Sequence, residues 1–333
     1  MSSAIVTGFR LSPQQRHLWP LQAGNASFNA WVAIMLTGPV DADRLQNALN
    51  EIVAKHEILR TSYQRLSGMT MPVQVIADFA TVELRSVELG GVFVSMAIDD
   101  FIATETAEPF DYERGPLVRA ALAALPADSY VLVVTLCAIC ADTRTLRNLF
   151  QEISTTAAQS DDEVVQYLQF SEWQHELMEE SEAEEGRAYW SKQQFTELPL
   201  QFEEDFADSE QFDPAVLRFE IPRDVTVAMS EVAAKFRVTL STLLLTCWQV
   251  LNWRLNDGEN VVVGQTFDGR KFEELEKAFG IFSKTLPLHV ELNNDKRFSE
   301  VIRATADQGL QAEQWQDYFV WQQDGGTNES SIK

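Results

Sequence analysis

The sequence has few cysteines and no long apolar run. Three cysteines occur among 333 residues, Cys137, Cys140 and Cys247. They are too few and too irregularly spaced for a disulfide framework, which favours a reducing, cytoplasmic location. The chain contains no uncharged apolar stretch of about eighteen residues, so we expect no transmembrane helix. Residues 1–10 lack the basic and apolar regions of a secretory signal.

Positive charge is also scarce. The chain has 26 lysines and arginines against 50 aspartates and glutamates, a formal net charge of −24. Such a field repels phosphate backbones and anionic lipids, so we expect neither nucleic acid nor a membrane as a partner. We interpret the acidic excess mainly as an aid to solubility, with attraction of a cationic partner surface as the alternative.

The motifs of common metal and phosphate sites are missing. The four histidines are His17, His56, His175 and His289. None of them pairs with a second ligand at metal spacing, and Cys137 and Cys140 have no second cysteine pair. We therefore expect no metal site. No glycine-rich phosphate loop occurs, so we expect no bound cofactor.

Hydrophobic periodicity predicts an α/β fold in the first half of the chain. We expect helices over 11–21, with Ser12 as the N-cap, over 41–56 and over 94–106, and strands over 29–37, 60–65, 73–76, 117–124 and 130–137. Residues 136–145 then form a loop between the last strand and a helix that carries Leu146 and Leu149 on one face. Loops at strand ends commonly carry function.

The second half begins with an acidic helical stretch, 161–194, which we expect to break near Gly186. Its run 179–185 is our candidate for the hinge between two lobes, with a solvated helix face or linker as the alternative. Beyond the crossing 195–214 we expect a strand over 216–221, a helix over 224–236, a buried helix over 239–255, strands over 261–266 and 286–292, and a helix over 298–315. The predicted divisions are an N-terminal lobe 1–178, an acidic linker 179–215, a partial C-terminal lobe 216–323 and a disordered tail 324–333.

Six short segments occur in a characteristic order. They are 11–19 (LSPQQRHLW), 56–61 (HEILRT), 110–117 (FDYERGPL, followed by Arg119), 166–174 (QYLQFSEWQ), 263–270 (VGQTFDGR) and 280–288 (GIFSKTLPL). Each is weak alone, but their order and spacing along nearly the whole chain resemble the condensation-domain family of nonribosomal peptide synthetases.

This resemblance implies two lobes related to chloramphenicol acetyltransferase, set in a V, with a tunnel between them. It implies that phosphopantetheine arms of partner carrier proteins enter the tunnel and that a donor thioester is joined to an acceptor amine. The implied partners are a carrier protein and either neighbouring synthetase modules or a tailoring enzyme.

The active loop of the family reads HHxxxDG, and here the corresponding residues are 137–143. Cys137 and Ala138 replace the two histidines, Thr143 replaces the glycine, and Asp142 is kept. The resemblance implies that Asp142 forms a structural pair with Arg60. Ala138 cannot accept a proton, whereas a histidine at this position could act as a general base. We interpret Cys137 as a packing residue, with a chemical role as the alternative.

The second lobe departs from the family pattern as well. Ser283 and Lys284 stand where the resemblance implies Val and Asn. Together with Gly264, Gly269 and Arg270 they are our candidates for the tunnel or lobe interface. The segment 315–319 resembles HQDxPFE with Trp for His, and the final strands of the family have no counterpart, so we expect an incomplete lobe with an unpaired sheet edge.

Three hypotheses remain open from the sequence. The first is a non-catalytic docking platform, as in degenerate condensation domains that recruit tailoring oxygenases. The second is an enzyme that forms an amide or ester without the histidine, by holding two carrier-bound reactants together. The third is a structural remnant that stabilises a larger synthetase.

Overall fold

The structure, a computed structural model, describes residues 8–21, 28–89, 94–155, 163–181, 183–193, 217–256 and 260–321. The chain divides into two compact units. Unit 1 contains Met1–Leu177 and Arg270–Ser283, and unit 2 contains Met178–Gly269 and Lys284–Lys333. The predicted C-terminal lobe is therefore interrupted, because its segment 270–283 packs within unit 1. The predicted crossing 195–214 and tail 324–333 lie outside the described residues.

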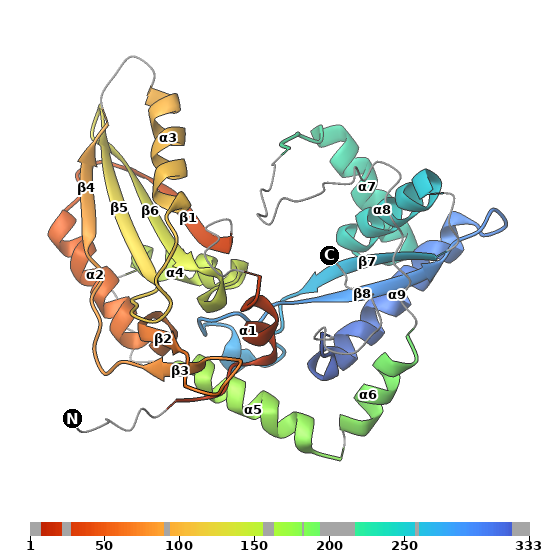
Figure 1. The fold of residues 1–333 in the computed structure, drawn as a ribbon. Coiled ribbons are helices and arrows are strands. Elements are labelled where there is room, and N and C mark those ends of the chain that lie inside the picture. Colours follow the sequence, from red (N-terminus) through yellow and green to blue (C-terminus); the bar gives the residue numbers. More distant parts are fainter. Residues whose placement is uncertain are drawn as a thin grey trace, which may run out of the picture. The chain divides into compact units, whose positions relative to one another are not determined.

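A four-stranded sheet forms the centre of unit 1 (Figure 1). Its strands, in spatial order, are β1 (Asn29–Thr37), β6 (Ser129–Cys137), β5 (Val118–Leu125) and β4 (Leu84–Glu88). The β1–β6 and β6–β5 pairs are antiparallel, and the β5–β4 pair is parallel. The first three strands confirm the sequence prediction to within one residue. Strand β4 was not predicted, because its exposed positions give little apolar periodicity.

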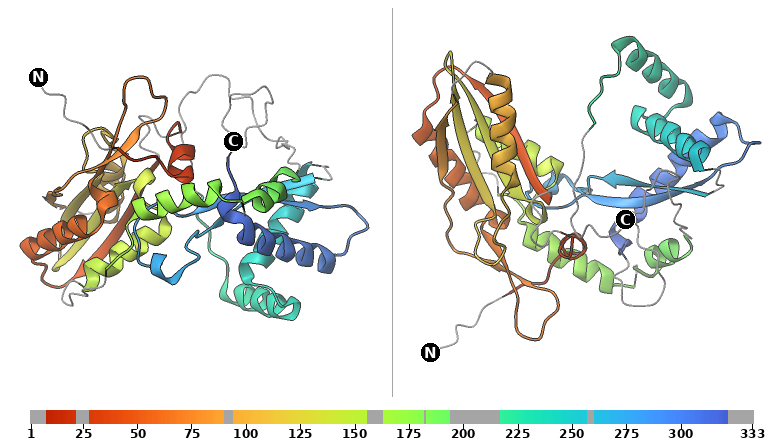
Figure 2. Two further views of the ribbon diagram at one scale, coloured as in Figure 1. Left: turned by 90° about the horizontal axis from the view of Figure 1, so that it is seen from below. Right: turned by 45° about the horizontal axis from the view of Figure 1, so that its top comes forward.

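Helices cover both faces of this sheet (Figures 1 and 2). The helices of unit 1 are α1 (Pro13–Leu18), α2 (Ala42–Lys55), α3 (Val94–Ala107), α4 (Thr143–Thr155) and α5 (Tyr167–Glu179), the last of which runs past the unit boundary. Successive side chains of β6 point to opposite faces of the sheet. Leu132 and Val134 join the core shared with α2 and α4, while Val131 and Val133 pack with Phe101 of α3. Burial on both faces explains the unbroken apolar run of β6.

Local signals set the helix starts as predicted. The Ser12 hydroxyl accepts a hydrogen bond from the Gln15 N–H at 3.2 Å, and the Gln15 side chain accepts one from the Ser12 N–H, forming a capping box. Asp41 caps α2 through the Arg44 N–H at 3.0 Å. A short hairpin, β2 (Thr61–Gln64) and β3 (Val73–Ile76), follows the 3₁₀ helix Glu57–Arg60.

Within the described residues, unit 2 contains one strand pair, four complete α-helices and the 3₁₀ helix Gln316–Tyr318. The strands β7 (Asn260–Phe267) and β8 (Lys284–Glu291) are antiparallel. The helices are α6 (Ala183–Ser191), α7 (Arg223–Phe236), α8 (Leu240–Asn256) and α9 (Phe298–Trp315). Leu286 and Leu288 of β8 pack with Ala312 of α9, which buries one face of the strand pair.

The predicted helical break near Gly186 is wrong. The stretch is interrupted between α5 and α6, and Gly186 lies inside α6. A Cβ at this position would stand 2.2 Å from the Tyr318 ring, so the glycine is needed for close packing rather than for a helix end.

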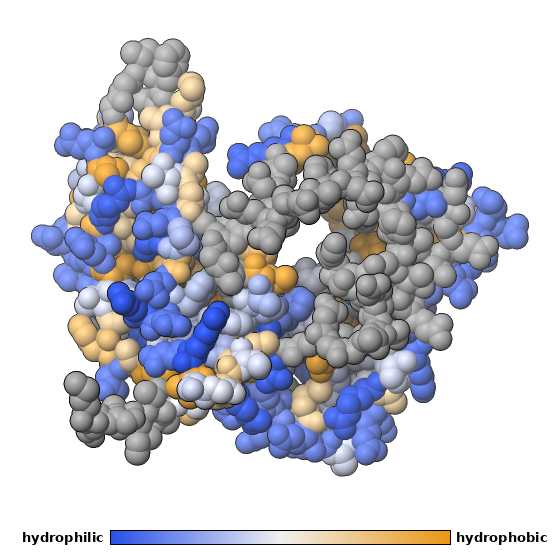
Figure 3. Space-filling view, viewed as in Figure 1, coloured by the Kyte–Doolittle hydropathy of each residue, from blue (hydrophilic) through white to orange (hydrophobic). Residues whose placement is uncertain are grey.

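Two further expectations for unit 2 are wrong. Residues 217–221 belong to no strand, and Leu217 and Phe219 are 87% and 77% exposed. Helix α8 is not fully buried, because one stripe of it is exposed; the stripe consists of Leu244, Trp248, Leu251 and Leu255. A sheet of two described strands is too narrow to cover both segments. Figure 3 shows orange apolar patches among hydrophilic residues on the face of the molecule that it draws.

Replacing Leu132 by alanine tests the layered core of unit 1. Leu132 is fully buried and lies between Ile34 of β1 and Leu122 of β5. We expect Leu132→Ala to lower the free energy of unfolding by about 2–5 kcal/mol because of the cavity it leaves. Urea unfolding followed by circular dichroism measures the change. Met35→Ala on β1, where the side chain is 56% exposed, is the control and should cost less than about 0.5 kcal/mol; equal losses would contradict the assignment.

Candidate functional site

The loop after β6 carries the motif positions of the sequence analysis. Strand β6 ends at Cys137, a 3₁₀ turn spans Ala138–Cys140, and α4 begins at Thr143. The side chain of Ala138 is partly exposed and that of Thr143 is exposed, whereas Cys137 and Cys140 are fully buried. The solvent-facing groups of this loop are therefore a methyl group and a hydroxyl group.

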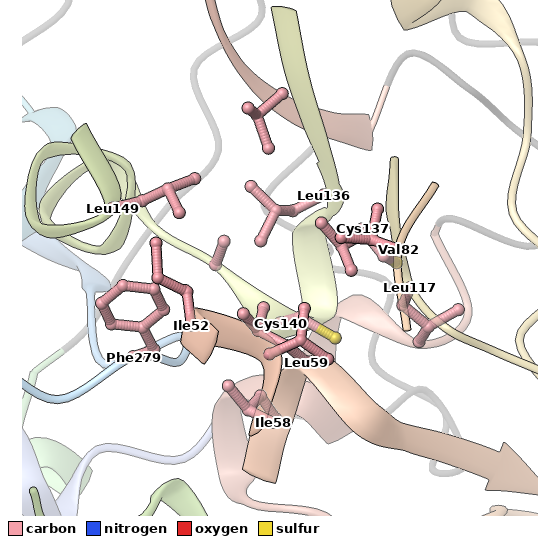
Figure 4. Packing of buried hydrophobic residues seen from close by; sticks show 14 of the residues in the cluster. Ile52, Ile58, Leu59, Val82, Leu117, Leu136, Cys137, Cys140, Leu149 and Phe279 are labelled. Atoms are coloured by element: carbon pink, nitrogen blue, oxygen red, sulfur yellow. The ribbon is translucent and has the colours of Figure 1, made fainter. Parts of the chain in front are cut away.

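The two cysteines of the loop are part of the hydrophobic core. Figure 4 shows Cys137 and Cys140 beside Leu59, Leu117 and Leu136. Burial raises the pKa of the Cys137 thiol to about 12 and the pKa of the Cys140 thiol well above its usual value. Both side chains are thus neutral thiols near pH 7, and a neutral thiol is neither a good nucleophile nor a base. This supports packing as the role of Cys137.

Asp142 anchors the loop through six hydrogen bonds. Its carboxylate accepts two from the Arg270 guanidinium at 2.8 and 3.0 Å, and two from the N–H and hydroxyl of Thr145 at 2.8 and 3.0 Å. The backbone N–H groups of Phe282 and Ser283 donate the others at 3.0 and 3.1 Å. The Asp142 and Arg270 side chains are 3% and 1% exposed. A bidentate pair with this many additional donors is the arrangement that a buried ion pair needs.

The implied pair of Asp142 with Arg60 is wrong. The Arg60 guanidinium donates to the backbone oxygen of Ala77 and lies 3.5 Å from the Glu57 carboxylate. Arg60 ends the 3₁₀ helix before the β2–β3 hairpin, and its side chain binds the backbone directly after β3. Asp142 instead faces segment 270–283, and its cation comes from 128 residues farther along the chain.

Two further hydrogen bonds hold segment 270–283 against the rest of unit 1. The Gly280 N–H donates to the Thr145 hydroxyl oxygen at 3.1 Å, and the Tyr167 hydroxyl donates to the Ile281 oxygen at 2.8 Å. Gly280 has a φ of +150°, and a Cβ there would stand 2.0 Å from the Tyr167 ring. No larger residue fits this position, a constraint that the sequence analysis missed.

Of the remaining candidates, Ser283 and Gly269 lie beside the Asp142–Arg270 pair, and Gly264 lies in unit 2. Ser283 lies at the Asp142 carboxylate, and Gly269 (φ +79°) makes the turn before Arg270. Gly264 lies in β7, where a Cβ would stand 2.8 Å from the Thr285 methyl group. Their place in a tunnel or lobe interface stays a prediction.

Lys284 belongs to unit 2 and is buried there. Its ammonium group donates to the Gln316 oxygen at 3.1 Å and lies 3.6 Å from the Asp317 carboxylate. The pair joins β8 to the 3₁₀ helix Gln316–Tyr318. Lys284 was a candidate from the sequence, but its partner Asp317 was not, because the two residues are 33 positions apart and in different motifs.

Among the described residues, no group of three or more His, Cys, Asp or Glu side chains is placed to hold a metal ion. In the same part of the chain, no helix is both long and apolar enough to cross a membrane.

Removing the charge of Asp142 should destabilise unit 1. We expect Asp142→Asn to cost about 3–5 kcal/mol of unfolding free energy, because the Arg270 guanidinium would stay buried without its counter-charge. Arg114→Gln is the control: its pair with Asp111 is largely exposed, so the cost should be within about 1 kcal/mol. Urea titration of both variants measures the difference, and comparable losses would show that the Asp142 pair is not the anchor.

Thiol labelling tests the burial of the loop cysteines. Cys247 is exposed, while Cys137 and Cys140 are buried with raised thiol pKa values. We expect iodoacetamide at mildly alkaline pH to modify Cys247 alone in the native protein and all three cysteines after denaturation. Peptide mass mapping identifies the modified residues. Rapid native labelling of Cys137 would instead support its chemical role.

Comparison with known proteins supplies the family. The family model described as the condensation domain matches residues 7–320. Bacitracin synthase 2 of Bacillus licheniformis is 28% identical over 320 residues, which cover 93% of this chain and 12% of the synthase. Chondramide synthase cmdD of Chondromyces crocatus is 30% identical over 323 residues, 92% of this chain and 8% of that protein. The chain thus spans about an eighth or less of these relatives.

Two solved structures show the same fold at low sequence identity. The condensation domain from the Monacolin K polyketide synthase MokA has a TM-score of 0.81 and 22% identity, covering 95% of this chain and 75% of that chain. The X-domain from teicoplanin biosynthesis has a TM-score of 0.77 and 21% identity, covering 95% and 73%. Since the family model spans nearly all of the sequence, the chain belongs to the condensation domain family.

Proposed function

We propose that this chain is a condensation-like domain of a nonribosomal peptide synthetase assembly line that forms no bond itself and serves as a docking platform for a carrier protein or a tailoring enzyme. The observation that carries the proposal is Ala138, whose methyl group occupies the motif position of a histidine. Cys137 and Cys140 are buried neutral thiols, and both Asp142 oxygens are held by hydrogen bonds. The loop therefore offers no general base for an acceptor amine.

The loop has lost its reactive group but keeps its support. Arg270, Thr145 and the 282–283 backbone hold the Asp142 carboxylate by hydrogen bonds. A domain that keeps its fold while its site lacks a base is suited to binding partners rather than to catalysis.

The surface of unit 2 supports a docking role. Trp248 and Leu251 of α8 are 55% and 46% exposed, and exposed apolar surface of this kind is typical of protein contacts. The fold neighbours include a solved complex of the X-domain and OxyB from teicoplanin biosynthesis, whose X-domain matches this chain with a TM-score of 0.72. That complex is a precedent for a condensation fold that binds another protein.

Binding to assembly-line proteins tests the docking role. We expect the purified chain to bind a phosphopantetheinylated carrier protein or a tailoring enzyme from its own gene neighbourhood in isothermal titration calorimetry. Trp248→Ala with Leu251→Ala should weaken binding at least about tenfold, because aromatic and apolar anchors dominate such interfaces. Leu310→Ala on α9, 65% exposed in the same unit, is the matched control and should bind normally. Absence of binding to every such protein would refute the proposal.

A catalytic role is the second candidate, and the intact Asp142 anchor is the observation that favours it. An amine already reacts with a thioester, so positioning alone could supply much of the acceleration. Under the docking proposal, mixing the chain with loaded donor and acceptor carriers leaves both loaded, as read from intact masses. Transfer by the wild type would establish catalysis, and Ala138→His should then raise the rate by about 10²-fold or more.

A further inference from the structure

A cavity of about 220 Å³ opens on unit 1, away from the Ala138 loop. One wall is α5 with Val165, which lies two residues before the helix, and the other is the segment after Arg270. The lining residues are Val165, Gln169, Phe170, Trp173, Phe272, Glu274 and Leu275. Three of these are aromatic, one is a carboxylate, and nothing in the proposed function uses them.

The aromatic rings form a corner. The Trp173 and Phe272 centroids are 5.7 Å apart and their planes meet at 88° in an edge-to-face contact, so the two lining rings stand nearly perpendicular to each other. Phe170 lies 5.7 Å from Trp173 at the base. Phe272 is 51% exposed, which leaves a large apolar ring facing solvent at the cavity mouth. Perpendicular ring walls of this kind can surround a compact cation.

The aromatic rings continue from the cavity into the core of unit 1, and the most buried of them contacts a cation. The Arg270 guanidinium carbon lies 4.1 Å from the centroid of Phe282, and Phe282 lies 4.5 Å from Phe170. Rings therefore lead from the buried Arg270 to the open cavity. The inner end binds a guanidinium through a ring face, and the outer end has ring surface without such a group among the described residues.

The charge of the cavity favours a cation. The loop 271–277 carries Lys271, Glu273, Glu274, Glu276 and Lys277. Of these, Glu274 borders the cavity, so its carboxylate supplies a negative charge beside the rings. The chain as a whole carries a formal net charge of −24, which also attracts cations.

We propose that this cavity binds a quaternary ammonium group. A primary ammonium brings three N–H donors that need acceptors, whereas the polar lining consists of the Glu274 and Gln169 side chains. A trimethylated ammonium has no donor to satisfy, and its methyl groups fit ring faces and the apolar side chains of Val165 and Leu275. The site is independent of whether the Ala138 loop is catalytic.

Choline and its uncharged isostere 3,3-dimethylbutan-1-ol are the probes. The two share shape and volume and differ in charge, so their ratio of affinities reports the cation–π and carboxylate contribution. We expect ligand-observed NMR titration of the full chain to show choline binding about 3- to 30-fold more tightly than the isostere. Equal affinities of choline and the isostere would overturn the proposal.

Two exposed positions provide the variants. Phe272→Leu keeps an apolar side chain without the ring, and Glu274→Gln keeps the shape without the charge. Each should weaken choline binding about threefold or more and leave the isostere unchanged. Phe79→Leu and Glu83→Gln, both exposed in unit 1 and outside the cavity lining, are the matched controls. Choline binding that survives both cavity variants would show that the ligand binds elsewhere.

Two sources of the ammonium group are distinguished by a second pair of probes, a trimethyllysine peptide and the same peptide with unmodified lysine. Preference for the trimethylated peptide over choline assigns the site to a modified partner protein. Preference for choline assigns it to a small molecule. Failure of both the peptide and choline to bind overturns the site.

Discussion

The buried pair between Asp142 and Arg270 is the interaction on which the rest of unit 1 depends. It joins the end of β6 to a segment that comes 128 residues later, at a place where both side chains are almost inaccessible to water. Removing either charge would leave the other buried without compensation. The pair therefore fixes the loop 137–143 and requires Arg270–Ser283 to fold with unit 1 rather than with the sequence around it.

The Asp142–Arg270 pair also holds the loop in place independently of any catalytic side chain in it. Asp142, Thr145 and Gly280 hold the loop by hydrogen bonds and close packing, and none of them needs an imidazole nearby. The histidine position could thus become Ala138 without loss of the fold. The same segment continues into the rings that form the outer cavity, so one stretch of chain supports both the motif loop and the proposed ammonium site.

The sequence predicted unit 1 better than unit 2 for a physical reason. Strand β6 is buried on both faces, and α2 has a clear apolar stripe with Asp41 as its cap, so local pattern and tertiary environment agree. In unit 2 the described sheet has two strands, so residues 217–221 have no strand to join and α8 leaves a stripe exposed. An apolar pattern shows which face could be buried, but not whether a partner strand is present to bury it.

Local residue order was sufficient to predict the family resemblance, strands β1, β5 and β6, helices α2 and α3, and the loss of the imidazole at Ala138, but not strand β4. The three-dimensional fold was needed to establish that Asp142 pairs with Arg270 rather than Arg60, that Lys284 pairs with Asp317, and that Gly186 packs against Tyr318 instead of ending a helix. These contacts join residues far apart in the chain. A buried charge requires some partner, but the fold alone determines which oppositely charged group reaches it.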